Sequence, residues 1–304
     1  MDWQPLLGRY TVTLEGILFH GEVVPFREAP GPALGNLISS QRLSAGTVSA
    51  RVRFESVSDY SACDILLAYQ PDHPSGPAFL TAGLGAGGLF SVRGFIGSWQ
   101  HLASAGDRSN LKSGLDYTVS VSLAGSHLAL TVDNVEVIRT TLPIVPPEGQ
   151  VGVWCSDVSP IHIAGFNVSP RRPRAFVVMQ YSKPYNELFS EVLSPVCESE
   201  GVDAERADDV AGPGMILTDI ARQISDAHFV VAEITPTNPN VYYEVGYAHA
   251  LNKPTILVAE HGTQLPFDVS PFRTLFYENT IEGKRRIEES FRRFVRAILR
   301  NPRV

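Results

Sequence analysis

The chain has few of the residues that would mark a metal site or a membrane span. Its 304 residues include only three cysteines, whose wide spacing does not fit a structural zinc site and predicts buried free thiols. No apolar run approaches the roughly 18 residues that a membrane helix requires. The first residues form neither a basic region nor a long apolar core. We therefore expect no metal, no membrane contact and a cytoplasmic location.

Positive charge is also scarce. The 25 lysines and arginines are outnumbered by 32 aspartates and glutamates, and the formal net charge of −7 makes nucleic acid an unexpected partner.

A chain of this length is long enough to form two domains. The segment from Ser169 to Arg174 contains two prolines and three arginines without apolar periodicity, which indicates a stiff linker. We place the two domains at residues 1–170 and 171–304.

The first domain has a hydrophobic period of two. Every second residue is apolar from Thr47 to Glu55 and again from Asp116 to Leu123, as in strands with one face on a core and one in water. Tight turns at 124–126 and 133–134 then separate two further short strands. Strands at intervals of about 8–12 residues, with no helix between them, predict an all-β sandwich.

The order of these segments resembles the concanavalin-like jelly roll of laminin-G and related glycan-binding or glycan-cleaving modules. The resemblance rests on 46–54, 65–69, Ser98-Trp99, Asp133-Asn134, 149–154 and 165–168. It implies a jelly-roll sandwich that senses, docks or oligomerises, with a protein or a glycan as possible partner. Four residues could form a sugar-stacking platform, although packing is the commoner role of such side chains: Tyr69, Arg93, Trp99 and His101. Asp64, Asp72, Asp107 and Asp157 could supply a carboxylate pair for glycoside hydrolysis. They lie in no recognisable motif, so we expect them in solvated loops.

Strands and helices alternate in the second domain. A continuous apolar run at 175–179 and mainly apolar strands at 229–234 and 254–259, with shorter strands near 202–207 and 274–277, are separated by helical patterns. Because parallel neighbours require crossovers, this order predicts a doubly wound α/β sheet whose strand ends meet at one edge. In open α/β sheets that edge binds ligands.

Polar side chains follow these strands. They are Gln180 and Ser182, then Asp208 and Asp209, then Asn238 and Asn240. Asn240 is expected to cap a helix in which Glu244 occupies the second turn. Asp219 is expected in a helix that borders the same edge. Tyr181, Tyr243 and Phe267 could stack on a base, so the edge predicts a nucleoside-type ligand.

Five blocks of the second domain resemble the nucleoside 2-deoxyribosyltransferase-like group, which shares a flavodoxin-like fold with TIR domains. The blocks are 176–182, 206–209, Asp219-Ile220 before 224–226, 238–250 and Pro266-Phe267-Asp268. Members cleave or exchange the bond between a base and its sugar, and TIR-like relatives in bacterial antiviral defence degrade NAD. The resemblance implies that Glu244 is the catalytic carboxylate and that Asp219 assists. Residues that would contact sugar or base, or shape the pocket, are Gln180, Ser182, Asp208, Asn238, Asn240, Tyr243, Phe267 and Asp268.

One departure from the group favours hydrolysis over transfer. True transferases carry an aspartate six residues before the glutamate, where this chain has Asn238, and an amide cannot shuttle a proton. The leading hypothesis is a homo-oligomeric N-glycosidase that uses NAD or a related nucleotide as substrate and needs no cofactor. The alternatives are a nucleoside deoxyribosyltransferase, a nucleotide sensor without turnover, and a lectin or glycosidase centred on the sandwich. Glu244 and Asp219 could also serve only as partners of helix dipoles.

Overall fold

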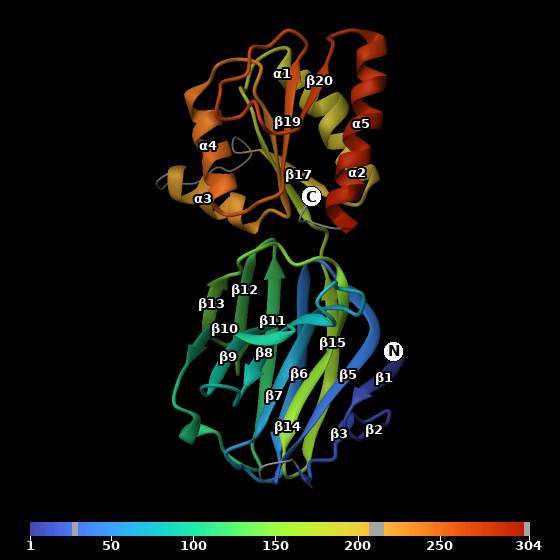
Figure 1. Ribbon diagram of the computed structural model, residues 1–304, viewed down its shortest axis with the longest axis vertical. Coiled ribbons are helices and arrows are strands. Elements are labelled where there is room, and N and C mark those ends of the chain that lie inside the picture. Colours follow the sequence, from blue (N-terminus) through green and yellow to red (C-terminus); the bar gives the residue numbers. More distant parts are fainter. Residues whose placement is uncertain (26–29, 207–215, 301–304) are drawn as a thin grey trace. The chain divides into compact units, whose positions relative to one another are not determined.

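The computed structural model describes residues 1–25, 30–206 and 216–300, and it divides into two compact units (Figure 1). The sandwich unit comprises 1–123, 127–140 and 148–171, and the parallel-sheet unit comprises 124–126, 141–147 and the chain from Arg172 onward. Asp208 and Asp209, which were predicted at the ligand edge, lie outside the described residues. In the part of the chain that is described, no helix is long and apolar enough to cross a membrane.

The sandwich unit consists of two antiparallel sheets. One sheet has the order β1-β5-β14-β7-β8-β9-β10, with the short β4 (Val23–Val24) added to β5. Its strands are β1 (Trp3–Leu7), β5 (Gly31–Leu43), β7 (Ala62–Gln70), β8 (Ala78–Leu84), β9 (Phe90–Ile96), β10 (Ser98–Ala105) and β14 (Gly149–Asp157). The other sheet has the order β13-β12-β11-β6-β15-β3-β2. Its strands are β2 (Tyr10–Val12), β3 (Ile17–Phe19), β6 (Gly46–Phe54), β11 (Asp116–Ala124), β12 (His127–Val132), β13 (Val135–Thr141) and β15 (Ile161–Pro170).

The period-two pattern explains the second sheet. Along β6 every second residue is buried, from Gly46 through Val48 and Val52 to Phe54, while the residues between them are more exposed. β11, β12 and β13 lie side by side in chain order, so the predicted meander is confirmed. The prediction of an all-β sandwich is confirmed as well. A single 3-10 turn, η1 (Arg108–Asn110), follows β10.

The first sheet differs because β7 is buried on both faces. Asp64 on β7 faces Trp154 on β14 and Gly83 on β8, so it lies on the side of the sheet opposite Cys63 and Ile65. The Asp64 carboxylate is fully buried and accepts from the Arg93 guanidinium at 2.6 Å. Arg93 in turn lies over the rings of Trp99 and Trp154, 4.1 and 4.4 Å from their centroids.

This burial corrects one expectation from the sequence. Asp64 and Asp157 were expected in solvated loops, but they are 1% and 0% exposed. Asp157 closes the end of β14, where its Oδ1 accepts from the backbone N–H of Val158 at 2.7 Å. Asp72 and Asp107 are exposed, as expected. Nothing in the sequence near Asp64 indicated its partner, because Arg93 lies 29 residues away on another strand.

The parallel-sheet unit contains five strands in the order β17-β16-β18-β19-β20, all parallel to their neighbours. They are β16 (Arg174–Val178), β17 (Asp203–Arg206), β18 (Phe229–Glu233), β19 (Thr255–Glu260) and β20 (Thr274–Tyr277). The helical segments are α1 (Tyr185–Leu188), the π-helical η2 (Phe189–Leu193), α2 (Ser194–Ser199), α3 (Ile216–Asp226), α4 (Pro239–Ala250) and α5 (Ile281–Arg300). Counted along the chain, the strand order is 2-1-3-4-5, so the direction of winding reverses between β16 and β18.

The sheet has an apolar core on each face, because alternate residues of its strands point to opposite sides. Val177, Phe229 and Val231 pack with η2, α2 and α5 on one face. Phe176, Val230 and Ala232 pack with α3 and α4 on the other. The prediction of a parallel α/β sheet covered on both sides is therefore confirmed, and α3 and α4 share one face.

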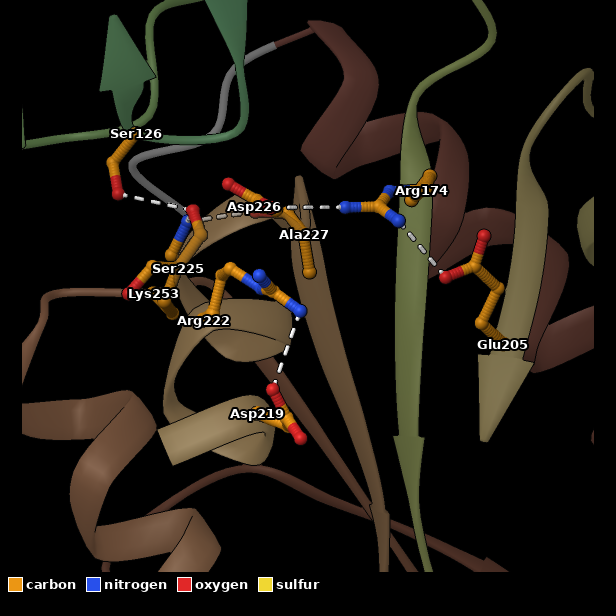
Figure 2. A network of polar contacts seen from close by, with 9 residues as sticks. All are labelled: Ser126, Arg174, Glu205, Asp219, Arg222, Ser225, Asp226, Ala227 and Lys253. Atoms are coloured by element: carbon orange, nitrogen blue, oxygen red, sulfur yellow. Dashed lines mark hydrogen bonds and ion pairs between the residues drawn. The ribbon is translucent and has the colours of Figure 1, made fainter. Parts of the chain in front are cut away.

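The amino edge of this sheet is held by a buried lysine and by ion pairs of a partly exposed arginine (Figure 2). Lys253, just before β19, is 4% exposed, and its Nζ donates to the carbonyls of Ser225 and Ala227 at 2.5 and 2.7 Å. Burial lowers the pKa of Lys253 to about 7. Arg174 at the start of β16 pairs with Asp226 at 3.4 Å and with Glu205 at 3.0 Å. These contacts lie at the edge opposite the carboxyl ends of the strands.

Candidate functional site

The turn between β18 and α4 begins the candidate site. Asn238 is the N-cap of α4, and its side-chain oxygen accepts from the backbone N–H of Asn240 at 3.0 Å. Pro239 then occupies the first helical position, where its missing N–H has no cost. The prediction that Asn240 is the cap was wrong by two residues, because it ignored the preference for proline directly after a cap. Asn240 is exposed and lies within the first turn.

Glu244 lies in the second turn of α4, between the buried residues Val241 and Val245. Its side chain is partly buried, and among the described residues it has no hydrogen-bond or ion-pair partner. Burial raises the pKa of Glu244 to about 7. A carboxyl group without a compensating partner, on a helix that starts at the carboxyl edge of a parallel sheet, is suited to chemistry near neutral pH.

Asp219 lies near the start of α3, on the same face of the sheet as α4. Its Oδ1 accepts from the Arg222 guanidinium at 3.2 Å, one turn farther along the helix (Figure 2). The Asp219 side chain is 37% exposed and that of Arg222 is 65% exposed. An ion pair this open to solvent breaks easily, so it leaves Asp219 available to a ligand.

The polar residues after β16 form a local pair. Gln180 and Ser182 are partly buried, and the Gln180 Nε2 donates to the Ser182 Oγ at 2.9 Å. The carbonyl of Ser182 accepts from the backbone N–H of Asn186, which begins the first helical turn. Both side chains therefore lie at the carboxyl end of β16, beside the point where the winding of the sheet reverses.

The remaining predicted residues are on the surface. Tyr243 is 61% exposed and Phe267 is 87% exposed, and Asp268 is exposed as well. No described hydrogen bond or ion pair joins any of them, or Gln180, Ser182 or Asp219, to Glu244. The structure thus places the predicted residues at the ends of β16 and β18 and on α3, α4 and the loop after β19. Asp208 lies outside the described part of the chain.

Sequence analysis missed a second glutamate in this region. Glu233, the last residue of β18, is 0% exposed, and burial raises its pKa. Its Oε1 accepts from the backbone N–H and the hydroxyl of Thr235 and from the Tyr277 hydroxyl at 3.2 Å, while its Oε2 has no partner among the described residues. An acid inside an otherwise apolar strand was the available signal.

Glu233 fixes the turn that leads to α4. The Thr235 hydroxyl that donates to Glu233 also accepts from the backbone N–H of Glu260 at 2.8 Å. The ends of β18, β19 and β20 are therefore joined through Glu233, Thr235 and Tyr277. Glu233 lies two residues after Val231 on β18, so the two side chains point to the same face of the sheet. That face is covered by η2, α2 and α5, and α4 covers the other face. We assign Glu233 to the support of the turn and not to the site of Glu244.

A hollow of about 150 Å³ lies on the same face as Glu233. Its lining includes Leu188, Val192, Tyr277, Lys284 and Ile287, from η2, α5 and their surroundings. Among the described residues, none of those predicted from the sequence lines it. Across the described residues, no three histidine, cysteine, aspartate or glutamate side chains are grouped to hold a metal ion.

No family model matches the chain, and no curated protein matches it. Three solved structures illustrate the similarities that exist. The carbohydrate-binding module CBM66 of Bacillus subtilis is 16% identical, with 54% of this chain and 92% of that chain covered and a TM-score of 0.44. The β-glucanase of Bacillus licheniformis is 11% identical, with 56% and 92% covered and a TM-score of 0.40. The CMP N-glycosidase BcmB of Clostridium botulinum is 16% identical, with 41% and 99% covered and a TM-score of 0.32. With TM-scores below 0.5, these similarities carry no conclusion about substrate or partner.

Proposed function

We propose that the parallel-sheet unit hydrolyses the N-glycosidic bond between base and ribose in a nucleotide, with NAD as the expected substrate. The observation that carries the proposal is the state of Glu244. This carboxyl group is partly buried, has no described hydrogen-bond or ion-pair partner and has a pKa of about 7. The order 2-1-3-4-5 of the sheet supports a flavodoxin-like fold, in which the carboxyl edge is the ligand site.

The proposed chemistry follows from the charge that develops during cleavage. When the bond between the anomeric carbon and the base breaks, positive charge remains on the sugar and the electron pair leaves with the base. The Glu244 carboxylate stabilises that charge or forms an ester with the anomeric carbon. Water then attacks the anomeric carbon, which breaks the ester where one has formed and releases the Glu244 carboxylate. The hydroxyl group joins the sugar, and the proton passes to the departed base or to solvent. Asp219, which accepts from the exposed Arg222, assists as proton donor or base-binding group.

Other residues have supporting roles in this proposal. Gln180 and Ser182 follow the first strand and contact the sugar or the base, and the sequence resemblance gives the same role to Asp208, which lies outside the described residues. We place Asn240, Tyr243, Phe267 and Asp268 around the bound nucleotide, and the two aromatic side chains are exposed enough to stack on a base. We further propose a homo-oligomer with a role in antiviral defence, in keeping with the TIR-like resemblance of the sequence.

Asn238 supports hydrolysis over base exchange. The side chain at this position caps α4, and its oxygen is engaged with the backbone N–H of Asn240. An amide in that position cannot donate and recover a proton between two bases. A deoxyribosyltransferase reaction would therefore need another acid, so incubation of a nucleoside with a second free base is expected to yield free sugar and no exchanged nucleoside.

The decisive experiment is incubation of the full chain with NAD and a nucleotide panel that includes CMP, over a range of protein concentrations. Wild type is expected to release base, and Glu244→Gln is expected to release none at matched concentration. Glu289→Gln, a change at an exposed glutamate of α5, is the matched control and should behave as wild type. Intact substrates at every concentration, together with calorimetric binding that Glu244→Gln does not alter, would favour the sensor alternative.

A second candidate function concerns the sandwich unit. Trp99 is 41% exposed, although it contacts Phe79, Phe95 and Trp154 edge to face. Exposed tryptophan faces bind the apolar faces of sugars, so this end of the sheet could bind a glycan. Glycan-array binding that is lost in Trp99→Ala would support the assignment. If wild type binds no glycan, Trp99 serves only to cover the Asp64–Arg93 pair.

A further inference from the structure

Two of the three cysteines face each other in the middle of the first sandwich sheet. Cys155 on β14 and Cys63 on β7 are direct partners in the antiparallel register, and their sulfur atoms are 3.8 Å apart. Both residues are free and buried, with exposures of 0% and 1%. They are separated by 92 residues along the chain. Their spacing in sequence gave no sign of this contact.

The backbone geometry at this pair suits a disulfide. Facing residues of antiparallel strands have Cα atoms about 4.5–5.5 Å apart, which lies inside the range of about 4.4–6.8 Å that disulfides span. The sulfur atoms would need to approach from 3.8 Å to about 2.05 Å, a change that small side-chain rotations can supply. The strands themselves need not move.

The neighbours of Cys155 hold its thiol toward Cys63. On its other side Cys155 faces Gly35 of β5. The Tyr10 hydroxyl fills the space above Gly35, since it would lie 2.3 Å from a Cβ added there. Burial raises the pKa of Tyr10, and the nearby Cys155 raises it further. The Tyr10 hydroxyl therefore lies close to Cys155. The space on the β5 side is thus taken, and the thiol lies on the β7 side.

We infer that Cys63 and Cys155 form an oxidation site that closes to an intrachain disulfide between β7 and β14. With a peroxide as oxidant, one thiol is oxidised to a sulfenic acid with release of water. The second sulfur then attacks the sulfenic sulfur, the S–S bond forms and a second water leaves. Overall two thiols and one hydrogen peroxide give one disulfide and two waters, and two electrons pass from the sulfurs to the peroxide.

The reaction is slow in the folded protein. The hydrogen bond to Cys155, followed by burial, raises the pKa of Cys63, so this group is a thiol and a weak nucleophile at neutral pH. Oxidation therefore proceeds at alkaline pH over hours, or rapidly when the chain refolds under oxidising conditions. Cys197 on α2, the third free thiol, is buried in the parallel-sheet unit and serves as an internal control.

The test counts thiols by mass. Full-length wild type is treated with hydrogen peroxide, or refolded in glutathione disulfide, then denatured and labelled with a maleimide mass tag. One tag per chain, on Cys197, and a linked Cys63–Cys155 peptide that dithiothreitol releases are expected, against three tags for reduced protein. Cys197→Ser should still oxidise and take no tag, and Cys155→Ser should keep two tags. Three tags after oxidative refolding, or a linked peptide that contains Cys197, would overturn the inference.

A second measurement needs no variant. Because the bond closes a loop of about 90 residues, oxidised wild type should melt several degrees above the reduced protein. Cleavage by the parallel-sheet unit should be the same in both forms. An equal melting temperature in the two redox states, with the linked peptide absent, would also overturn the inference.

Discussion

Asp64 in the sandwich and Glu244 in the parallel-sheet unit are two carboxyl groups that are removed from water in different ways. In the sandwich, Asp64 is fully buried and its charge is matched by Arg93 at 2.6 Å. In the parallel-sheet unit, Glu244 is partly buried with no described partner, and burial raises its pKa to about 7. A paired buried charge holds strands together, whereas a partly buried carboxyl group without hydrogen bonds costs stability, and we propose that Glu244 is retained for its chemistry. Under that proposal, Asp64 supports the fold and Glu244 acts on the ligand.

The strongest test of the contrast is removal of the unpaired carboxyl group. Glu244→Gln is expected to lower kcat for base release by about a thousandfold or more, because the amide cannot stabilise the developing positive charge as a carboxylate does. The overall fold should be unchanged by circular dichroism. Chromatography measures the base that the variant and wild type release. Retention of wild-type activity, with Glu289→Gln equally active, would remove Glu244 from the site.

Removal of the paired carboxyl group should act on stability instead. Asp64→Ala leaves the Arg93 guanidinium buried between two tryptophan rings without its counter-charge, and we expect a loss of about 3–5 kcal/mol in the free energy of unfolding of the sandwich. The matched control is Asp116→Ala, which breaks an exposed pair with Arg53 at 3.9 Å and should cost no more than about 0.5 kcal/mol. Urea unfolding followed by tryptophan fluorescence measures both. Equal losses in the two variants would contradict the contrast.

The pH dependence of Glu244 gives a third test. As a carboxylate catalyst with a pKa of about 7, it should make kcat/KM rise about tenfold per pH unit below 7 and level off above it. A kcat/KM that falls above pH 7 would instead assign Glu244 as the general acid.

The same group should affect stability with a defined sign. The pKa of Glu244 is raised from 4.5 to about 7, so the folded state binds the proton more tightly and loses stability as pH rises through that window. Glu244→Gln removes this loss. The variant should therefore melt higher than wild type at pH 8 and close to wild type at pH 4. An identical difference in melting temperature at both pH values would show that Glu244 is not perturbed.

The smallest expected effect concerns the helix that carries Glu244. Asn238→Ala removes the side chain that accepts from the Asn240 N–H and should cost about 1 kcal/mol of stability. Asn240→Ala removes an exposed side chain within the helix and should be close to neutral. Denaturant midpoints of the two variants measure the difference. A larger loss at Asn240 would restore the capping role first expected of it.

Much of the architecture follows from local patterns. Alternation along β6 and β11 predicted half-buried strands, and the apolar runs at β16, β18 and β19 predicted a parallel core. The proline directly after Asn238 is a local signal that places the cap of α4 at Asn238. Local backbone preferences and hydrophobic period act within a few residues, so a sequence can reveal them.

Contacts between distant segments could not be inferred in this way. Glu233 carried only the weak signal of an acid in an apolar strand, and its partner Tyr277 lies 44 residues farther along the chain. The partners of Asp64 and Cys63 lie 29 and 92 residues away. Strand order and register decide which side chains meet, and single-strand patterns do not encode them. By itself the sequence determined the elements, the two-part organisation and the candidate acid Glu244. Only the tertiary structure decided which buried groups are paired, because pairing depends on how strands far apart in the chain come to lie side by side.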